Sequence, residues 1–143
     1  MTSKCVTFNH MLILTKPVTL NHLSLPVNMY LFAIEGGPPA SCERNRKDEV
    51  GCGGYHLTKE YHKECGNLGN DWPLCGIYNS CAIACINTYI AKYRDICAYH
   101  VNKPIHLLTC QDHARIHFGG PKGCRGSTAK LYADTVASLC ELD

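Results

Sequence analysis

The stretch CGNLGNDWPLCGIYNSCAIAC, residues 65–85, carries four cysteines in 21 residues and constrains the fold more than any other segment. The rest of the chain is also rich in cysteine: 11 of its 143 residues are cysteines, and ten of them lie between Cys42 and Cys140. A content of about 8% is where disulfide scaffolds begin. Thiols in this number persist mainly as disulfides or as metal ligands, so the first question is which of the two they form.

The spacing of the cysteines favours disulfides. Structural zinc sites usually present closely spaced pairs of ligands that converge on one ion. The sequence has no C-x-x-C motif, and only Cys81 and Cys85 lie four residues apart, a spacing typical of one face of a helix. We therefore expect a disulfide scaffold without a metal or other cofactor, and a cysteine-rich zinc module is the alternative.

Length and charge narrow the classes of protein further. A chain of 143 residues predicts one domain, residues 34–143, preceded by an irregular segment, residues 1–33. The net charge of +2, with no long run of Lys or Arg, argues against a nucleic-acid partner. No apolar stretch is long enough to span a membrane. These features leave the oligomeric state open.

The cysteines predict a secreted protein, because stable disulfides need an oxidising compartment. The first thirty residues nevertheless lack the basic start, the apolar core and the cleavage site of a secretory signal. We expect the genuine upstream sequence to supply a leader peptide. The odd number of cysteines, 11, agrees with this expectation, because at least one thiol lacks its partner.

The pattern of the chain predicts an α+β fold, mainly helical with a short β-hairpin. Glycines near Val50–Tyr55 indicate a short bent strand, and Thr58 is a suitable N-cap for a helix that ends at Glu64. Residues 66–74 read as a loop. Apolar periodicity and capping residues predict three further helices, at 79–98, 110–118 and 127–139. In the last helix the larger apolar residues, including Leu131 and Val136, are expected to face the core.

Two segments resemble the invertebrate-type (i-type) lysozymes, the family that includes destabilase. The segment CQDHARIHFGGPKGC, residues 110–124, closely resembles a signature of that family. The segment CGGYHL, residues 52–57, is followed by Tyr61 and Cys65 and is similar to a second conserved pattern. The resemblance covers about residues 35–140. It implies a small lysozyme-like α+β domain and a secreted enzyme, antibacterial or digestive, that cleaves the β-1,4 bond of peptidoglycan.

Glycoside hydrolysis requires two carboxyl groups, one protonated to act as the acid and one ionised to act as nucleophile or charge stabiliser. The resemblance places the acid at Glu35, which follows the apolar residues 30–34. A desolvated carboxyl of this kind has a raised pKa. The resemblance places the second carboxylate at Asp48, with Glu49 as the neighbouring alternative. Tyr55, His56 and His117 are the expected substrate contacts.

The chain also departs from the family pattern. The cysteines that precede the acid in the family are absent, so a non-catalytic, glycan-binding or interaction scaffold is the alternative function. Some family members also cleave isopeptide bonds. Their serine position is Gly51 here and their lysine position is Thr58, with Lys59 displaced by one residue. Since a base without its nucleophile cannot transfer an acyl group, isopeptidase activity is expected to be lost.

Two further predictions concern the sulfurs and histidines. The resemblance implies the disulfides Cys42–Cys52, Cys65–Cys85, Cys75–Cys81 and Cys110–Cys124, and it leaves Cys5, Cys97 and Cys140 unassigned. His113 and His117, four residues apart, suit a metal only if a third ligand joins them. Packing is the commoner role for such histidines, so no metal is predicted there.

Overall fold

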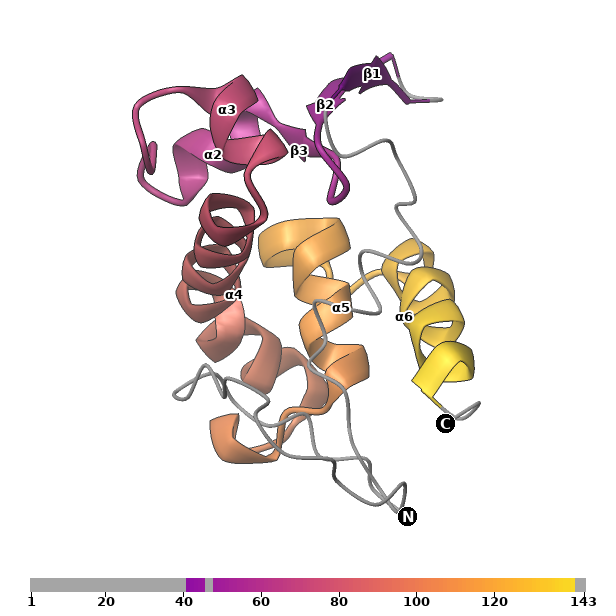
Figure 1. Ribbon diagram of the computed structural model, residues 1–143. Helices are drawn as coiled ribbons and strands as arrows, with labels where there is room; N and C mark the ends of the chain where they lie inside the picture. Colours follow the sequence, from indigo (N-terminus) through magenta and orange to yellow (C-terminus); the bar gives the residue numbers. More distant parts are fainter. Residues whose placement is uncertain (1–40, 46–47, 141–143) are drawn as a thin grey trace, which may run out of the picture.

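The computed structural model describes residues 41–45 and 48–140. The predicted irregular segment 1–33 and the candidate acid Glu35 lie outside these residues. Figure 1 shows a small sheet and two short helices at one end of the molecule, with three longer helices side by side beyond them. The predicted α+β class is confirmed, and the sheet is one strand larger than the expected hairpin.

The sheet is antiparallel and has the strand order β1-β2-β3. Strand β1 spans Cys42–Arg44, β2 spans Val50–Cys52 and β3 spans Leu57–Thr58. In the first pair Cys42 lies opposite Cys52 and Arg44 opposite Val50. The second pair joins Gly51 to Thr58. A tight turn with a hydrogen bond from the His56 N–H to the Gly53 carbonyl connects β2 to β3.

The helices follow the sheet in the chain. Helix α2 spans Lys59–Glu64 and begins at the predicted cap, since the Thr58 hydroxyl accepts a hydrogen bond from the Tyr61 N–H. The remaining elements are α3 (Trp72–Ile77), α4 (Asn79–Val101), the 3-10 turn η1 (Ile105–Leu107), α5 (Cys110–Gly119), the 3-10 turn η2 (Gly120–Lys122) and α6 (Ser127–Cys140). Helix α4 extends three residues beyond the expected end at residue 98.

Helix α3 corrects the prediction that residues 66–74 form a loop throughout. Asp71 caps this helix, because its side chain accepts a hydrogen bond from the Leu74 N–H. Pro73 lies in the first turn, where its missing N–H costs nothing. Helix α3 packs closely over β2: a Cβ atom on Gly76 would lie 2.6 Å from the Cys52 carbonyl oxygen, so glycine is required there.

The core lies where α4, α5 and α6 meet, and small residues contribute much of it. Ile86, Ile116 and Val136 are fully buried, and Ala133 of α6 is nearly so. Leu131, expected on the inner face of α6, is 72% exposed, and that prediction is wrong. The capping box at Thr109 begins α5, with the Asp112 carboxylate accepting from the Thr109 N–H and hydroxyl.

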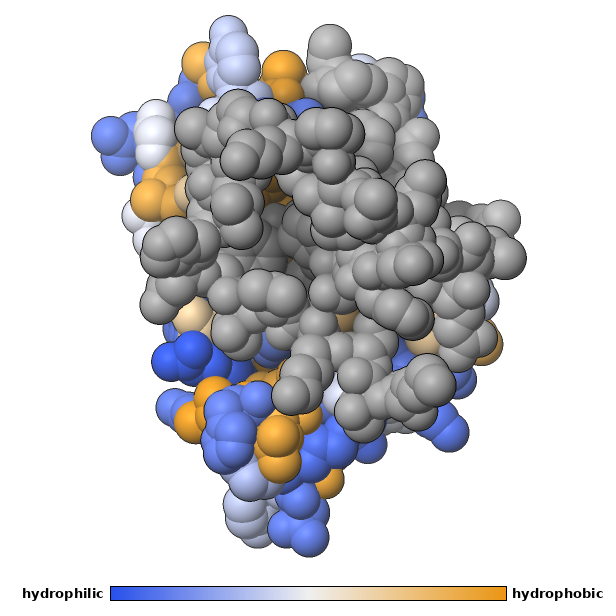
Figure 2. Space-filling view, turned by 60° about the horizontal axis from the view of Figure 1, so that its bottom comes forward, coloured by the Kyte–Doolittle hydropathy of each residue, from blue (hydrophilic) through white to orange (hydrophobic). Residues whose placement is uncertain are grey.

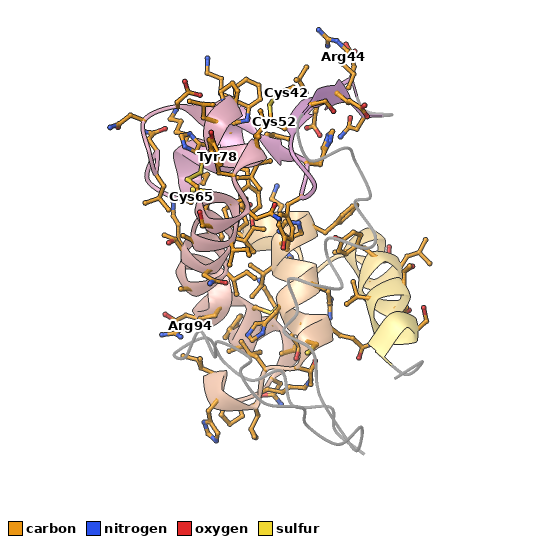
Figure 3. The ribbon with its side chains drawn as sticks, viewed as in Figure 1. Cys42, Arg44, Cys52, Cys65, Tyr78 and Arg94 are labelled. Atoms are coloured by element: carbon orange, nitrogen blue, oxygen red, sulfur yellow. A yellow bond between two sulfur atoms is a disulfide. The ribbon has the colours of Figure 1, made fainter. Side chains whose placement is uncertain are left out.

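Disulfides tie the sheet and helices together. Cys42–Cys52 joins β1 to β2 (Figure 3). Cys65–Cys85 joins the end of α2 to α4, and Cys75–Cys81 joins α3 to α4. These three agree with the predicted pairs. The fourth is Cys97–Cys124, so the predicted pair Cys110–Cys124 is wrong. Cys110 is itself disulfide-bonded and therefore has a different partner.

On the face shown in Figure 2, the described residues place hydrophobic side chains in small groups among hydrophilic ones. Of the large apolar side chains that the structure describes, Tyr99 of α4 and Leu131 of α6 are the most exposed. Within residues 41–45 and 48–140, none of the helices has the length and apolar character needed to cross a bilayer.

Candidate active site

A cleft of about 650 Å³ lies between the sheet and the helices. One wall comes from the β1–β2 hairpin and the β2–β3 turn, and the other from α2. The floor comes from α4 and α5. Its lining combines four carboxylates with several aromatic side chains; the lining residues are Glu43, Arg44, Asn45, Glu49, Tyr55, His56, Leu57, Thr58, Glu60, Tyr61, Glu64, Tyr89, His117, Phe118 and Gly119. A cleft of this size, with aromatic surfaces and several polar groups, suits a ligand that offers both apolar faces and hydroxyl or amide groups.

The hairpin wall holds Glu49 by a set of hydrogen bonds between Glu49 and Asn45. The Asn45 side-chain amide donates to Glu49 Oε2 at 3.2 Å, and Asn45 Oδ1 accepts from the Glu49 N–H at 3.0 Å. The Asn45 N–H also donates to the Glu49 carbonyl at 2.9 Å. These bonds continue the antiparallel pairing beyond the strands, and they fix a carboxylate at the cleft.

Asp48, the residue predicted to be the second carboxylate, lies differently. Its backbone is left-handed, with φ of 63°, and its side chain is 85% exposed. The Arg44 guanidinium donates to Asp48 Oδ1 at 3.0 Å and to its carbonyl at 3.1 Å. Figure 3 shows Arg44 at the outer end of the hairpin, away from the helices. Among the described residues that line the cleft, Glu49 is present and Asp48 is not.

His56 covers the sheet beside the cleft. Its backbone is left-handed, with φ of 52°, and the imidazole lies over Gly51. A Cβ atom at position 51 would lie 2.4 Å from the His56 ring, so the ring occupies the space that a side chain there would need. The buried Nε2 atom of His56 has no hydrogen-bond partner within the described part of the chain.

The floor of the cleft is aromatic. The Tyr61 ring stacks on the Tyr89 ring with a centroid distance of 3.8 Å, and the Tyr61 hydroxyl shares a hydrogen bond of 2.8 Å with His117 Nδ1. Burial lowers the pKa of His117 to about 4, so its imidazole is neutral at neutral pH. Burial also raises the pKa of Tyr89 to about 12 and raises the pKa of Tyr55.

The α2 wall carries a second carboxylate group, Glu64, which two residues of α4 hold. Glu64 Oε2 accepts hydrogen bonds from the Lys92 ammonium and, at 2.6 Å, from the Tyr93 hydroxyl. The hydrogen bond from Lys92, followed by that from Tyr93, lowers the pKa of Glu64. Glu64 is therefore ionised and unsuited to donate a proton.

The structure brings together the predicted contact residues Tyr55, His56 and His117, all of which line the cleft. The sequence reasoning did not single out Glu60 or Glu64, although their four-residue spacing on a short helix marks one helix face. It also missed Tyr89 and Phe118. In the described part of the chain, no three His, Cys, Asp or Glu side chains converge as a metal ion would require, and the nine cysteines from Cys42 to Cys124 are in disulfides.

Comparisons with known proteins agree with this architecture. Residues 35–140 match the family described as Destabilase. The chain is 33% identical over 87 residues to a lysozyme of Ostrea edulis, covering 61% of this chain and 58% of that protein. It is 33% identical over 104 residues to an invertebrate-type lysozyme of Ruditapes philippinarum, covering 73% and 71%.

A crystal structure of Tapes japonica lysozyme superposes on this fold with a TM-score of 0.65 at 28% identity, covering 79% of this chain and 87% of that one. The matches span 58% of the Ostrea edulis lysozyme and 40% of lysozyme 1 of Crassostrea virginica, so this chain corresponds to only part of those relatives. The family match covers most of the chain, and the fold is that of a solved lysozyme. The chain belongs to the invertebrate-type lysozyme, or destabilase, family.

Proposed function

We propose that the protein is a secreted muramidase that hydrolyses the β-1,4 glycosidic bond of peptidoglycan. The observation that carries this proposal is an open cleft, lined by carboxylates and floored by aromatic rings, in a chain of the invertebrate-type lysozyme family. An extended glycan needs such an open groove, and its cleavage needs carboxyl groups on the walls. Disulfides throughout the described chain support an oxidising, extracellular compartment.

The proposed reaction uses Glu35 as general acid and a carboxylate of the β1–β2 hairpin as nucleophile or charge stabiliser. Asp48 is the hairpin residue expected from the family pattern, and Glu49 is its neighbour. The acid protonates the leaving glycosidic oxygen while the ionised carboxylate stabilises the positive charge that develops at the anomeric carbon. Tyr55, His56 and His117 are the proposed contacts on the sheet and floor.

Lysis of bacterial cell walls, followed by turbidity, tests the proposal. The oxidised protein should clear a wall suspension, and Glu35→Gln should abolish clearing while leaving binding to sedimented peptidoglycan intact. Binding without any clearing by the parent protein would instead support the non-catalytic, glycan-binding scaffold. Clearing that survives Glu35→Gln would refute the role of that residue.

Isopeptidase activity is not part of the proposal. Gly51 stands at the position of the family's serine, and the His56 ring fills the space above it, which supports the absence of a nucleophile there. The purified protein should release no lysine from an ε-(γ-Glu)-Lys dipeptide. Release at a rate above that of a heat-inactivated sample would contradict this expectation.

A further inference from the structure

We infer that Glu49, and not Asp48, is the carboxylate that the hairpin presents to the substrate, with Asn45 as the residue that positions it. This inference rests on the proposed glycosidase function and identifies the second carboxylate of that reaction. It depends on the register of the hairpin, the hydrogen bonds of three side chains and the lining of the cleft.

The register decides which residues share a side of the hairpin. Directly paired residues project to the same side of an antiparallel sheet, and neighbours along a strand alternate. Glu43 pairs with Gly51, so the side that carries them also carries Asn45 and Glu49, two residues further on. The His56 ring lies over Gly51 on this side of the hairpin. The side chains of Glu43, Asn45 and Glu49, which project from the same side, all line the cleft.

Hydrogen bonding also distinguishes the two candidate carboxylates, Asp48 and Glu49. The Arg44 guanidinium occupies Asp48 Oδ1, on the exposed turn. Glu49 accepts only one side-chain hydrogen bond among the described residues, from the Asn45 amide to Oε2, and its Oε1 is left for a ligand. A catalytic carboxylate must be held in place by its neighbours and still keep one oxygen available to the substrate. Both carboxylates are held by a neighbour, but Asn45 holds Glu49 at the cleft, whereas Arg44 holds Asp48 on the turn, outside the cleft lining.

Glu43 is the remaining carboxylate on the same side. The Ser41 hydroxyl approaches its carboxylate at 3.5 Å, which is long for a hydrogen bond between two oxygens. No amide donor comparable to Asn45 restrains it within the described chain. Glu43 therefore provides a matched control, since it has the same charge, the same strand face and the same cleft but no fixed orientation.

The test compares Glu49→Gln, Asp48→Asn and Glu43→Gln in the oxidised chain, with kcat and KM measured on soluble peptidoglycan fragments. Gln at position 49 can still accept the Asn45 hydrogen bond, so the fold should be preserved, and thermal unfolding checks this. We expect Glu49→Gln to lower kcat about a hundredfold or more while KM stays within about threefold. Asp48→Asn should keep kcat within about threefold of the parent, and Glu43→Gln, which removes a carboxylate from the same cleft, should lower kcat at least about tenfold less than Glu49→Gln does. Glu49→Asp should recover part of the lost rate.

The outcomes separate this inference from the proposed function. If the parent and Glu49→Gln hydrolyse equally, or if Asp48→Asn loses kcat as Glu49→Gln does, the assignment of Glu49 is wrong, while the muramidase function stands. If the parent hydrolyses no glycan at all, the proposed function and this assignment fail together. A loss of kcat confined to Glu49→Gln, with unchanged binding and folding, supports the assignment.

Discussion

The imidazole of His117 and the phenol of Tyr61, 56 residues apart in sequence, share a hydrogen bond of 2.8 Å on the floor of the cleft. The contact joins α5 to α2, so it couples the helical body to the wall of the candidate active site. His117 is 8% exposed, and its burial is the cause of its lowered pKa. A neutral His117 is therefore part of the folded structure.

This burial makes stability depend on pH. The pKa of His117 is about 4 when folded and 6.5 in the reference state, so the unfolded chain binds the proton more tightly between these values. The stabilisation that neutral His117 adds to the free energy of unfolding is about 3 kcal/mol in all. It is fully present above pH 6.5 and is lost as the pH falls through about 4. Urea unfolding at pH 7, 5.5 and 4.5 should show this slope.

The His117→Gln variant isolates the effect from that of other titrating groups. His113 is also buried and its pKa is also lowered, so it contributes a slope of the same sign in both proteins. The parent should have a higher free energy of unfolding than His117→Gln at pH 7, and this difference should shrink as the pH falls to 4.5. A difference that does not change with pH would show that His117 is protonated as readily in the folded protein as in the unfolded chain.

The disulfides should differ in their effect on stability according to the loops they close. Cys97–Cys124 closes 27 residues and Cys75–Cys81 closes six. In the chain-entropy model, replacing both cysteines by serine should cost about 3.5 kcal/mol for the first pair and about 2 kcal/mol for the second. Chemical unfolding of the two double variants provides the comparison. Peptide mapping without reduction that joined Cys110 to Cys124 would contradict the pairing itself.

The packing of His56 on Gly51 can be measured by a double-mutant cycle. Gly51→Ala should destabilise the protein by about 1–3 kcal/mol, because the new methyl group overlaps the imidazole. In the His56→Ala background the same substitution should cost much less. Gly126→Ala is the matched control, since a Cβ atom there has its nearest neighbour at 3.9 Å. Equal costs of Gly51→Ala in both backgrounds would show that the two residues do not compete for space.

Glu64 provides a prediction about the other wall of the cleft. Its ion pair with Lys92 keeps the carboxylate ionised, so it should not serve as the proton donor. Glu64→Gln should therefore keep kcat on peptidoglycan fragments within about fivefold of the parent, with the same pH optimum. A loss as large as that of Glu35→Gln would move the acid from residue 35 to α2.

Local signals and family resemblance predicted much of the fold. Thr58 and Thr109 begin helices as their capping patterns indicate. Helix α3 was missed because Pro73 was interpreted as part of a loop, whereas proline is well tolerated in a first helical turn. The partner of Cys124 was also missed, since spacing alone does not determine how cysteines pair.

The remaining errors concern which way side chains face. Leu131 was expected inside because large apolar residues usually define the buried face of a helix. In α6 the inner face is instead made by Ala129, Ala133 and Val136, and Gly119 of α5 comes close to Ala129. The choice between Asp48 and Glu49 is of the same kind but remains a prediction, since the two are neighbours in sequence and differ in where the hairpin places them. These outcomes depend on tertiary packing and strand pairing, which a linear pattern does not contain.

The most direct test of the account is the chemical identity of the ends formed when the oxidised protein digests purified peptidoglycan. The products are reduced with borohydride and analysed by mass spectrometry. The account predicts new reducing ends on N-acetylmuramic acid, recovered as the muramitol derivative, with none formed by Glu35→Gln. Binding to the same peptidoglycan without any new reducing end would contradict it.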